Sequence, residues 1–146
     1  MDIQRYLDNY FITKDMPFIV GTKGIQNLFR NADILQSKKI HFFCDPILRK
    51  PTTNAYGKET QIVASTTYCI AVTSTMDMPY FNELNTDNAQ SKFTLNIEPL
   101  IAVMNGIVRD LSCGGYDVSF DYIDVTDVKD VNFDGLIGSI SFTKTP

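Results

Sequence analysis

A run of oxygen-bearing side chains near the C-terminus has the spacing of the first half of a calcium-binding loop. Asp130, Asn132 and Asp134 alternate with apolar residues, and Gly135 follows directly. In such loops the oxygens at positions 1, 3 and 5 converge on the ion, and a glycine at position 6 permits the turn. The twelfth position holds Ser141 in place of the required glutamate, and the flanking patterns are those of strands. A tight β-turn is the favoured interpretation, and an ion site is the alternative.

Six aspartates gather around this run, with Lys129 as the one cation among them. They are Asp117, Asp121, Asp124, Asp127, Asp130 and Asp134. A solvated strand face with its loop explains the pattern, and the alternatives are a cation site or an acidic docking surface. None of the six has the apolar sequence neighbours that a carboxyl group needs to act as a general acid near neutral pH.

The cysteines and the single histidine form no catalytic or metal-binding pattern. Cys44, Cys69 and Cys113 have no paired spacing, and an odd number of such thiols is typical of an intracellular protein. His41 and Cys44 are three positions apart on one predicted strand, so their side chains point to opposite faces. No zinc spacing, phosphate loop or dinucleotide fingerprint is present. The sequence therefore predicts no enzyme activity, no catalytic residue, no metal ligand and no cofactor.

One basic cluster lies in a polar segment between two predicted strands. Arg49, Lys50 and Lys58 surround the aromatic Tyr56. A solvated hairpin tip explains the cluster, and the alternative is a contact with phosphate or with an acidic partner. The whole chain has 13 Lys and Arg against 17 Asp and Glu, a net charge of −4. Three cations are too few for DNA binding by a single copy, but they would matter if a ring repeated them.

The charge is divided unevenly along the chain. Residues 1–60 have nine basic and six acidic side chains, a net charge of +3, whereas residues 61–146 have a net charge of −7. Opposite charges favour head-to-tail self-association, in which a basic face of one copy meets an acidic face of another. The alternative is that folding brings the two parts together and cancels the asymmetry.

Apolar spacing predicts two helices. The first is Ile3–Phe11, which ends before Pro17, and the second extends from Ile97 to Leu111 over about four turns. Asn96 is a candidate N-cap of the second helix, and two glycines beginning at Gly114 end it.

Four segments have the composition of strands. They are Ile40–Leu48, Gln61–Ser74, Tyr116–Val125 and Leu136–Thr143. The polar segment Arg49–Glu59 is predicted to be a long hairpin connection. Because Gln61–Ser74 exceeds the usual strand length, we expect the hairpin around residues 40–74 to protrude.

These elements predict a single α+β domain over residues 1–146. Its antiparallel sheet has about four strands from two hairpins and is covered by the long amphipathic helix, with an N-terminal helix beside it. The N-terminus has charges where a signal peptide needs an apolar core, and the apolar runs are too short to span a bilayer. We therefore expect a soluble protein made in the cytoplasm, without membrane contacts.

The C-terminal stretch from Phe120 to Pro146 resembles the ending of small neck and tail proteins of tailed bacteriophages. In those proteins a segment of the form Asn-x-Asp-x-Leu-x-Gly precedes a final strand. Here the segment comprises Asn132, Asp134, Leu136 and Gly138, and Ser139 replaces the usual aromatic residue after the glycine. The order of helix, long hairpin, helix and closing hairpin is also similar to that of tail terminator and tail-completion proteins.

The resemblance implies a structural virion protein, a tail terminator by preference, made in the host cytoplasm. It implies a homo-oligomeric ring, often six-fold, at the head–tail connection, and no enzymatic residues. The partners are further copies, other neck and tail proteins, and DNA passing through the ring. On this hypothesis the contact residues are Arg49, Lys50, Tyr56, Lys58, Asp124, Asp127, Asp130 and Asp134. The alternative hypothesis is a cytoplasmic ligand- or calcium-binding α+β domain that uses Asp130, Asn132 and Asp134.

Overall fold

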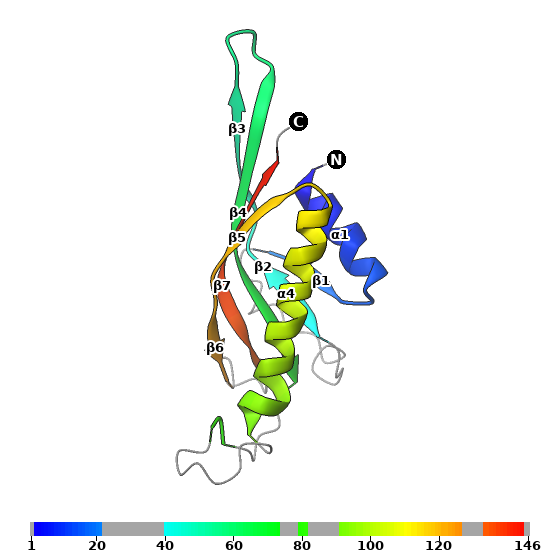
Figure 1. Cartoon of the computed structure of the whole chain (residues 1–146), viewed down its shortest axis with the longest axis vertical. Coiled ribbons are helices and arrows are strands. Elements are labelled where there is room, and N and C mark those ends of the chain that lie inside the picture. Colours follow the sequence, from blue (N-terminus) through cyan, green and yellow to red (C-terminus); the bar gives the residue numbers. More distant parts are fainter. Residues whose placement is uncertain (1, 22–39, 74–78, 82–90, 127–132, 145–146) are drawn as a thin grey trace.

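The computed structural model describes residues 2–21, 40–73, 79–81, 91–126 and 133–144. Within these ranges, two helices and a π-helical turn lie on one side of a sheet, in a mixed α+β architecture (Figure 1). The helical elements are α1 (Ile3–Thr13), the π-helical turn η2 (Phe93–Ile97) and α4 (Glu98–Cys113). The strands are β1 (Phe18–Val20), β2 (His41–Cys44), β3 (Leu48–Thr53), β4 (Glu59–Thr73), β5 (Asp117–Phe120), β6 (Ile123–Val125) and β7 (Phe133–Lys144).

The sheet has the strand order β1-β2-β4-β7-β5, with β3 also paired to β4 and β6 also paired to β7. β4 and β7 form the central antiparallel pair, in register from Ile62 opposite Lys144 to Thr73 opposite Phe133. β1 runs parallel to β2. The predicted antiparallel sheet of about four strands covered by one long helix is therefore wrong, because the described residues form a mixed sheet of seven strands with both α1 and α4 on one side.

The additional strands come from segments without a clear alternation of apolar residues. β1 has only three residues, too few to show a period of two. Leu48–Thr53 pairs with β4 although all of its residues are exposed, so the predicted connection Arg49–Glu59 is in large part a strand. The predicted strand Tyr116–Val125 is divided into β5 and β6, which pair with β7 in one continuous register.

The two predicted helices are present, and both bury the expected stripe. α1 buries Ile3, Leu7 and Phe11, and α4 buries Leu100, Met104, Ile107 and Leu111. The Asp2 side chain caps α1 by accepting a hydrogen bond from the backbone N–H of Gln4 at 2.9 Å. The predicted cap of the second helix is wrong, because Asn96 lies inside η2 and directs its side chain elsewhere.

Side chains of the central strands alternate between the two faces of the sheet. The face under the helices carries the main core, with Phe42, Tyr68, Ile70, Leu136, Ile140 and Phe142. The opposite face has a second apolar cluster of Phe43, Cys69, Ala71 and Phe133. His41 is buried on this second face and stacks on Phe43 with ring centroids 5.8 Å apart, whereas Cys44 packs in the main core. The predicted opposite orientation of His41 and Cys44 is confirmed.

Gly138 allows the chain between β5 and β6 to cross close to β7. A Cβ atom at this position would lie 1.9 Å from the carbonyl oxygen of Asp121. The buried hydroxyl of Tyr68 donates a hydrogen bond of 2.9 Å to the same carbonyl. Tyr68 is the register partner of Gly138 on β4, so the Asp121 carbonyl lies close to Gly138 and is bonded by the side chain of the glycine's neighbour. Gly138, the glycine of the Asn-x-Asp-x-Leu-x-Gly segment, therefore has a packing function.

Candidate functional site

β3 and the first part of β4 form a hairpin that projects beyond the rest of the sheet (Figure 1). Asn54 shapes its tip, residues 54–58, by accepting hydrogen bonds from the backbone N–H groups of Tyr56 (2.9 Å) and Lys58 (3.1 Å). Gly57 takes a positive φ of 75°, which glycine adopts without strain. Tyr56 is 95% exposed. The hairpin thus holds an aromatic ring in water at the end of a two-stranded ribbon.

The structure separates Arg49 from the other predicted contact residues of the hairpin. Its guanidinium donates two hydrogen bonds of 2.7 Å to the carboxylate of Asp2 and one of 3.0 Å to the carbonyl of Ile47. Arg49 therefore attaches the base of the hairpin to α1. Lys50 and Lys58 are exposed and remain the basic residues of the projecting part.

The contact between Arg49 and Asp2 is expected to contribute stability that depends on pH. The hydrogen bond from Arg49 lowers the pKa of Asp2 below the usual 3.8. The contribution is present above this usual value and is lost as the pH falls through the lower folded-state pKa. The side chains are 39% and 48% exposed, so we expect about 0.5–1 kcal/mol.

Arg49→Met should therefore be less stable than the wild type near neutral pH, and the difference should shrink in strong acid. Thermal unfolding of the two proteins from neutral pH into strong acid measures the difference in stability and its dependence on pH. A difference that does not change with pH would contradict the expectation.

Of the four aspartates predicted as contact residues, the structure describes Asp124 and Asp134, and these two differ in their surroundings. Asp124 lies on β6, and its carboxylate accepts a hydrogen bond from the hydroxyl of Tyr80. Asp134 lies in β7 and is completely buried. Asp127, Asp130 and Asn132 are outside the residues that the structure describes. Asp134 is therefore not part of an exposed acidic surface.

The tight turn predicted at Asp134 and Gly135 is also wrong. Both residues lie inside β7, opposite Val72 and Ala71 of β4. An Asp-Gly pair favours a turn when it is solvated, but here the carboxylate has polar partners inside the protein. Gly135 fits the strand because a Cβ atom would lie 2.5 Å from the carbonyl oxygen of Ile70.

Asp134 forms a buried polar cluster with two residues near the start of α4. Asn96 Nδ2 donates to Asp134 Oδ2 at 2.8 Å, and Lys92 Nζ lies 3.9 Å from Oδ1. Lys92 is 3% exposed. Both carboxylate oxygens therefore face protein groups, which does not favour Asp134 as a calcium ligand. Within the described ranges, no group of three or more His, Cys, Asp or Glu side chains is placed to hold a metal ion.

The sequence did not reveal the roles of Lys92 and Asn96. The two residues precede a helix, where polar residues are ordinary, and they meet Asp134 only because η2 packs against β7. A lysine that precedes an apolar helical stripe is too common a pattern to predict burial.

The three thiols are expected to differ strongly in reactivity. Burial raises the pKa of Cys44 and of Cys69 to about 12, so that both remain protonated near neutral pH. Cys113 is exposed at the end of α4. We expect a thiol reagent such as DTNB to label one cysteine per folded chain and three after unfolding. Cys113→Ser should remove the fast reaction, and fast labelling of Cys44 or Cys69 in the native protein would contradict this.

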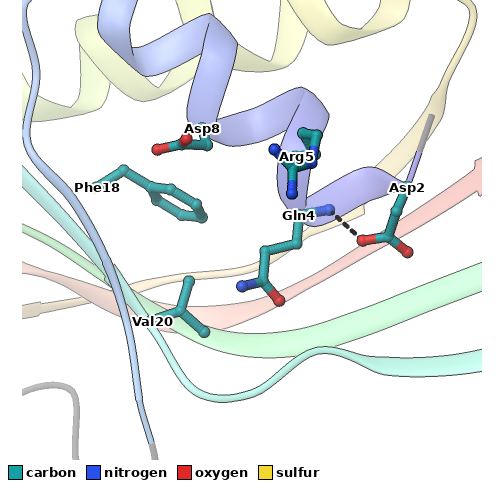
Figure 2. A pocket seen from close by; sticks show the side chains of 6 residues that line it. All are labelled: Asp2, Gln4, Arg5, Asp8, Phe18 and Val20. Carbon is teal, nitrogen blue, oxygen red and sulfur yellow. Dashed lines mark hydrogen bonds between the residues drawn. The ribbon is translucent and has the colours of Figure 1, made fainter.

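A hollow of about 500 Å³ lies between α1 and the edge strand β1. The residues that line it are Asp2, Gln4, Arg5, Asp8, Phe18 and Val20. Figure 2 shows the polar side chains of α1 beside the apolar Phe18 and Val20. Asp2 is already bound to Arg49, and the described lining contains no cysteine, histidine or hydroxyl group. This hollow therefore combines carboxylates and one guanidinium without a nucleophile.

No protein-family model matches the chain, and a search of curated proteins finds no match either. No helix in the described part of the chain is long and apolar enough to cross a membrane. The contacts and charges of the hairpin and of the sheet are therefore the basis for assigning a function.

Proposed function

We propose that the protein is a structural subunit of a tailed bacteriophage virion, a tail terminator that assembles with copies of itself into a ring. The single observation that supports this most is the projecting hairpin with Tyr56 at its tip. A two-stranded hairpin is marginally stable alone, and an aromatic side chain has about 150–250 Å² to bury. A neighbouring subunit would cover the Tyr56 side chain, which the described part of its own chain leaves 95% exposed.

The charge of the hairpin also supports assembly between copies. The stretch from Lys50 to Lys58 has two cations and no carboxylate, in a chain whose net charge is −4. A basic projection on an acidic protein favours contacts with further copies and with DNA in the lumen of a ring. Such a contact is heterologous, and rotation can close it into a ring.

The phage assignment rests on the resemblance of the segment that contains Asp134, Leu136 and Gly138. These residues support the final strand of the sheet, which agrees with a structural role for the segment. We propose a role without catalysis, in the neck or at the top of the tail, beside other neck and tail proteins.

Light scattering coupled to gel filtration, with electron microscopy of the same fractions, tests the assembly. The expected result is a closed ring, with six-fold symmetry as the first expectation. A strict monomer at all concentrations would contradict the proposal. The phage assignment has a separate test, because the neighbouring reading frames should encode other head, neck or tail proteins.

A further inference from the structure

The sheet face opposite the helices contains a hollow of about 470 Å³ beside the base of the hairpin. Its floor consists of small hydroxyl side chains in two rows across β4, β7 and β5. One row is Ser65, Ser141 and Ser119, and the next is Thr67 and Ser139, at whose end the backbone N–H of Asp121 bonds to the carbonyl of Ser139. Their neighbours Ala64, Phe142 and Val118 point into the core under the helices, so the hydroxyl groups point away from it. We call this region the serine hollow.

The serine hollow has the chemistry of a recognition surface. Serine and threonine hydroxyls donate and accept hydrogen bonds, and their small size leaves room for a larger incoming side chain. Asp45 and Asp121 give the hollow negative charge, and its described lining contains no lysine or arginine. Asp121 Oδ1 accepts a hydrogen bond of 2.8 Å from the backbone N–H of Ser139, which holds this carboxylate in place.

The hairpin has the complementary chemistry. Tyr56 carries an aromatic ring and one hydroxyl group, and Lys50 and Lys58 carry positive charge. Pro51 lies in the middle of β3 and has no N–H to donate, and Lys50 precedes it. Proline and lysine on an edge strand disfavour pairing with another strand. The tip of the hairpin is therefore better suited to contact than its edge.

We infer that the hairpin tip of one copy docks in the serine hollow of the next copy. Tyr56 packs against the hydroxyl floor, and Lys58 and Lys50 face Asp45 and Asp121. Leu48 and Ser65 line the hollow and form a register pair at the base of the hairpin, whereas the tip projects away from this base (Figure 1). The tip therefore cannot reach the hollow of its own chain, and the contact is between copies. This inference rests on the proposed self-assembly and names the surface through which it occurs.

Photo-cross-linking identifies the surface that the tip touches. With the photo-reactive p-benzoylphenylalanine in place of Tyr56, the assembled protein is irradiated and the cross-linked peptides are sequenced by mass spectrometry. Cross-links between copies should map to residues 45–48, 65–67, 119–121 and 139–141. The same label in place of Ile12, which is 68% exposed on α1 and lies on the other side of the sheet, is the control and should not reach these peptides. Cross-links from position 56 to any other surface would overturn the inference.

A charge reversal with its rescue provides an independent test. Lys58→Glu should weaken self-association about tenfold, and Asp45→Lys in the same chain should restore it. Arg5→Glu makes an equal change of charge on α1 and should have little effect. Equal weakening by Arg5→Glu, or no rescue by Asp45→Lys, would overturn the inference.

The two proposals fail differently. A ring whose tip cross-links elsewhere overturns docking in the serine hollow and leaves the tail terminator proposal standing. A monomer at all concentrations overturns both proposals.

Discussion

Replacing Asp134 by alanine is expected to lower the free energy of unfolding by about 3–5 kcal/mol. The substitution removes a fully buried carboxylate whose oxygens lie 2.8 Å from Asn96 Nδ2 and 3.9 Å from Lys92 Nζ. A buried ammonium group that loses its carboxylate keeps the desolvation penalty without the attraction that offset it. Urea denaturation followed by circular dichroism measures the loss, and the slope of the transition should stay unchanged.

Two companion variants show whether the charge is the cause. Asp124→Ala removes a partly exposed carboxylate from the adjacent β6 and should cost about 1 kcal/mol or less. Asp134→Leu combined with Lys92→Met replaces the pair by apolar side chains and should recover much of the stability lost in Asp134→Ala. If Asp134→Ala costs no more than Asp124→Ala, the buried cluster does not stabilise the fold in this way.

The parts of the fold that the sequence predicts correctly are the elements whose apolar residues recur at a regular spacing. The stripe of α4 recurs every three or four residues, and Val118 and Phe120 alternate with exposed residues on β5. Each pattern records which side of an element faces the core, so it can be recognised without knowledge of the partner. The long β4 was predictable for the same reason, because β-branched residues recur along it.

The remaining parts depend on partners that are distant in the sequence. β3 is exposed throughout and is a strand only because β4 lies beside it. Asp134 was predicted to be a turn residue or an ion ligand, since aspartate before glycine is common in both. Its burial depends on Lys92 and Asn96, and no spacing rule connects these residues with β7. Arg49 was assigned to a contact surface for its charge, although Asp2 already occupies its guanidinium.

The structure also shows how the described residues of the Asn-x-Asp-x-Leu-x-Gly segment pack. Asp134 belongs to the buried polar cluster, Leu136 is completely buried in the main core, and Gly138 leaves room for the carbonyl of Asp121. All three residues hold β7 between its neighbours. In this chain the residues of the segment that the structure describes therefore serve to pack the final strand of the sheet.

Shortening the hairpin is expected to abolish assembly and leave the fold of the single chain intact. Residues 52–61 are replaced by Asn-Gly, which joins the register partners Pro51 and Ile62 through a two-residue turn. The pairs from Leu48 with Ser65 to Pro51 with Ile62 remain. All removed residues are exposed except the half-buried Gln61, so the free energy of unfolding should change by about 1 kcal/mol or less.

This variant separates folding from assembly because the removed segment makes almost no contact with the core of its own chain. The ion pair of Arg49 with Asp2 is retained and continues to attach the base of the hairpin to α1. Tyr56→Ala is the smaller companion change and should weaken assembly without eliminating it, since the two lysines remain. Light scattering should show a folded monomer for the shortened chain under conditions in which the wild type forms a ring. A shortened chain that still forms the ring would exclude the hairpin as the assembly element, and one that fails to fold would show that the hairpin serves its own chain.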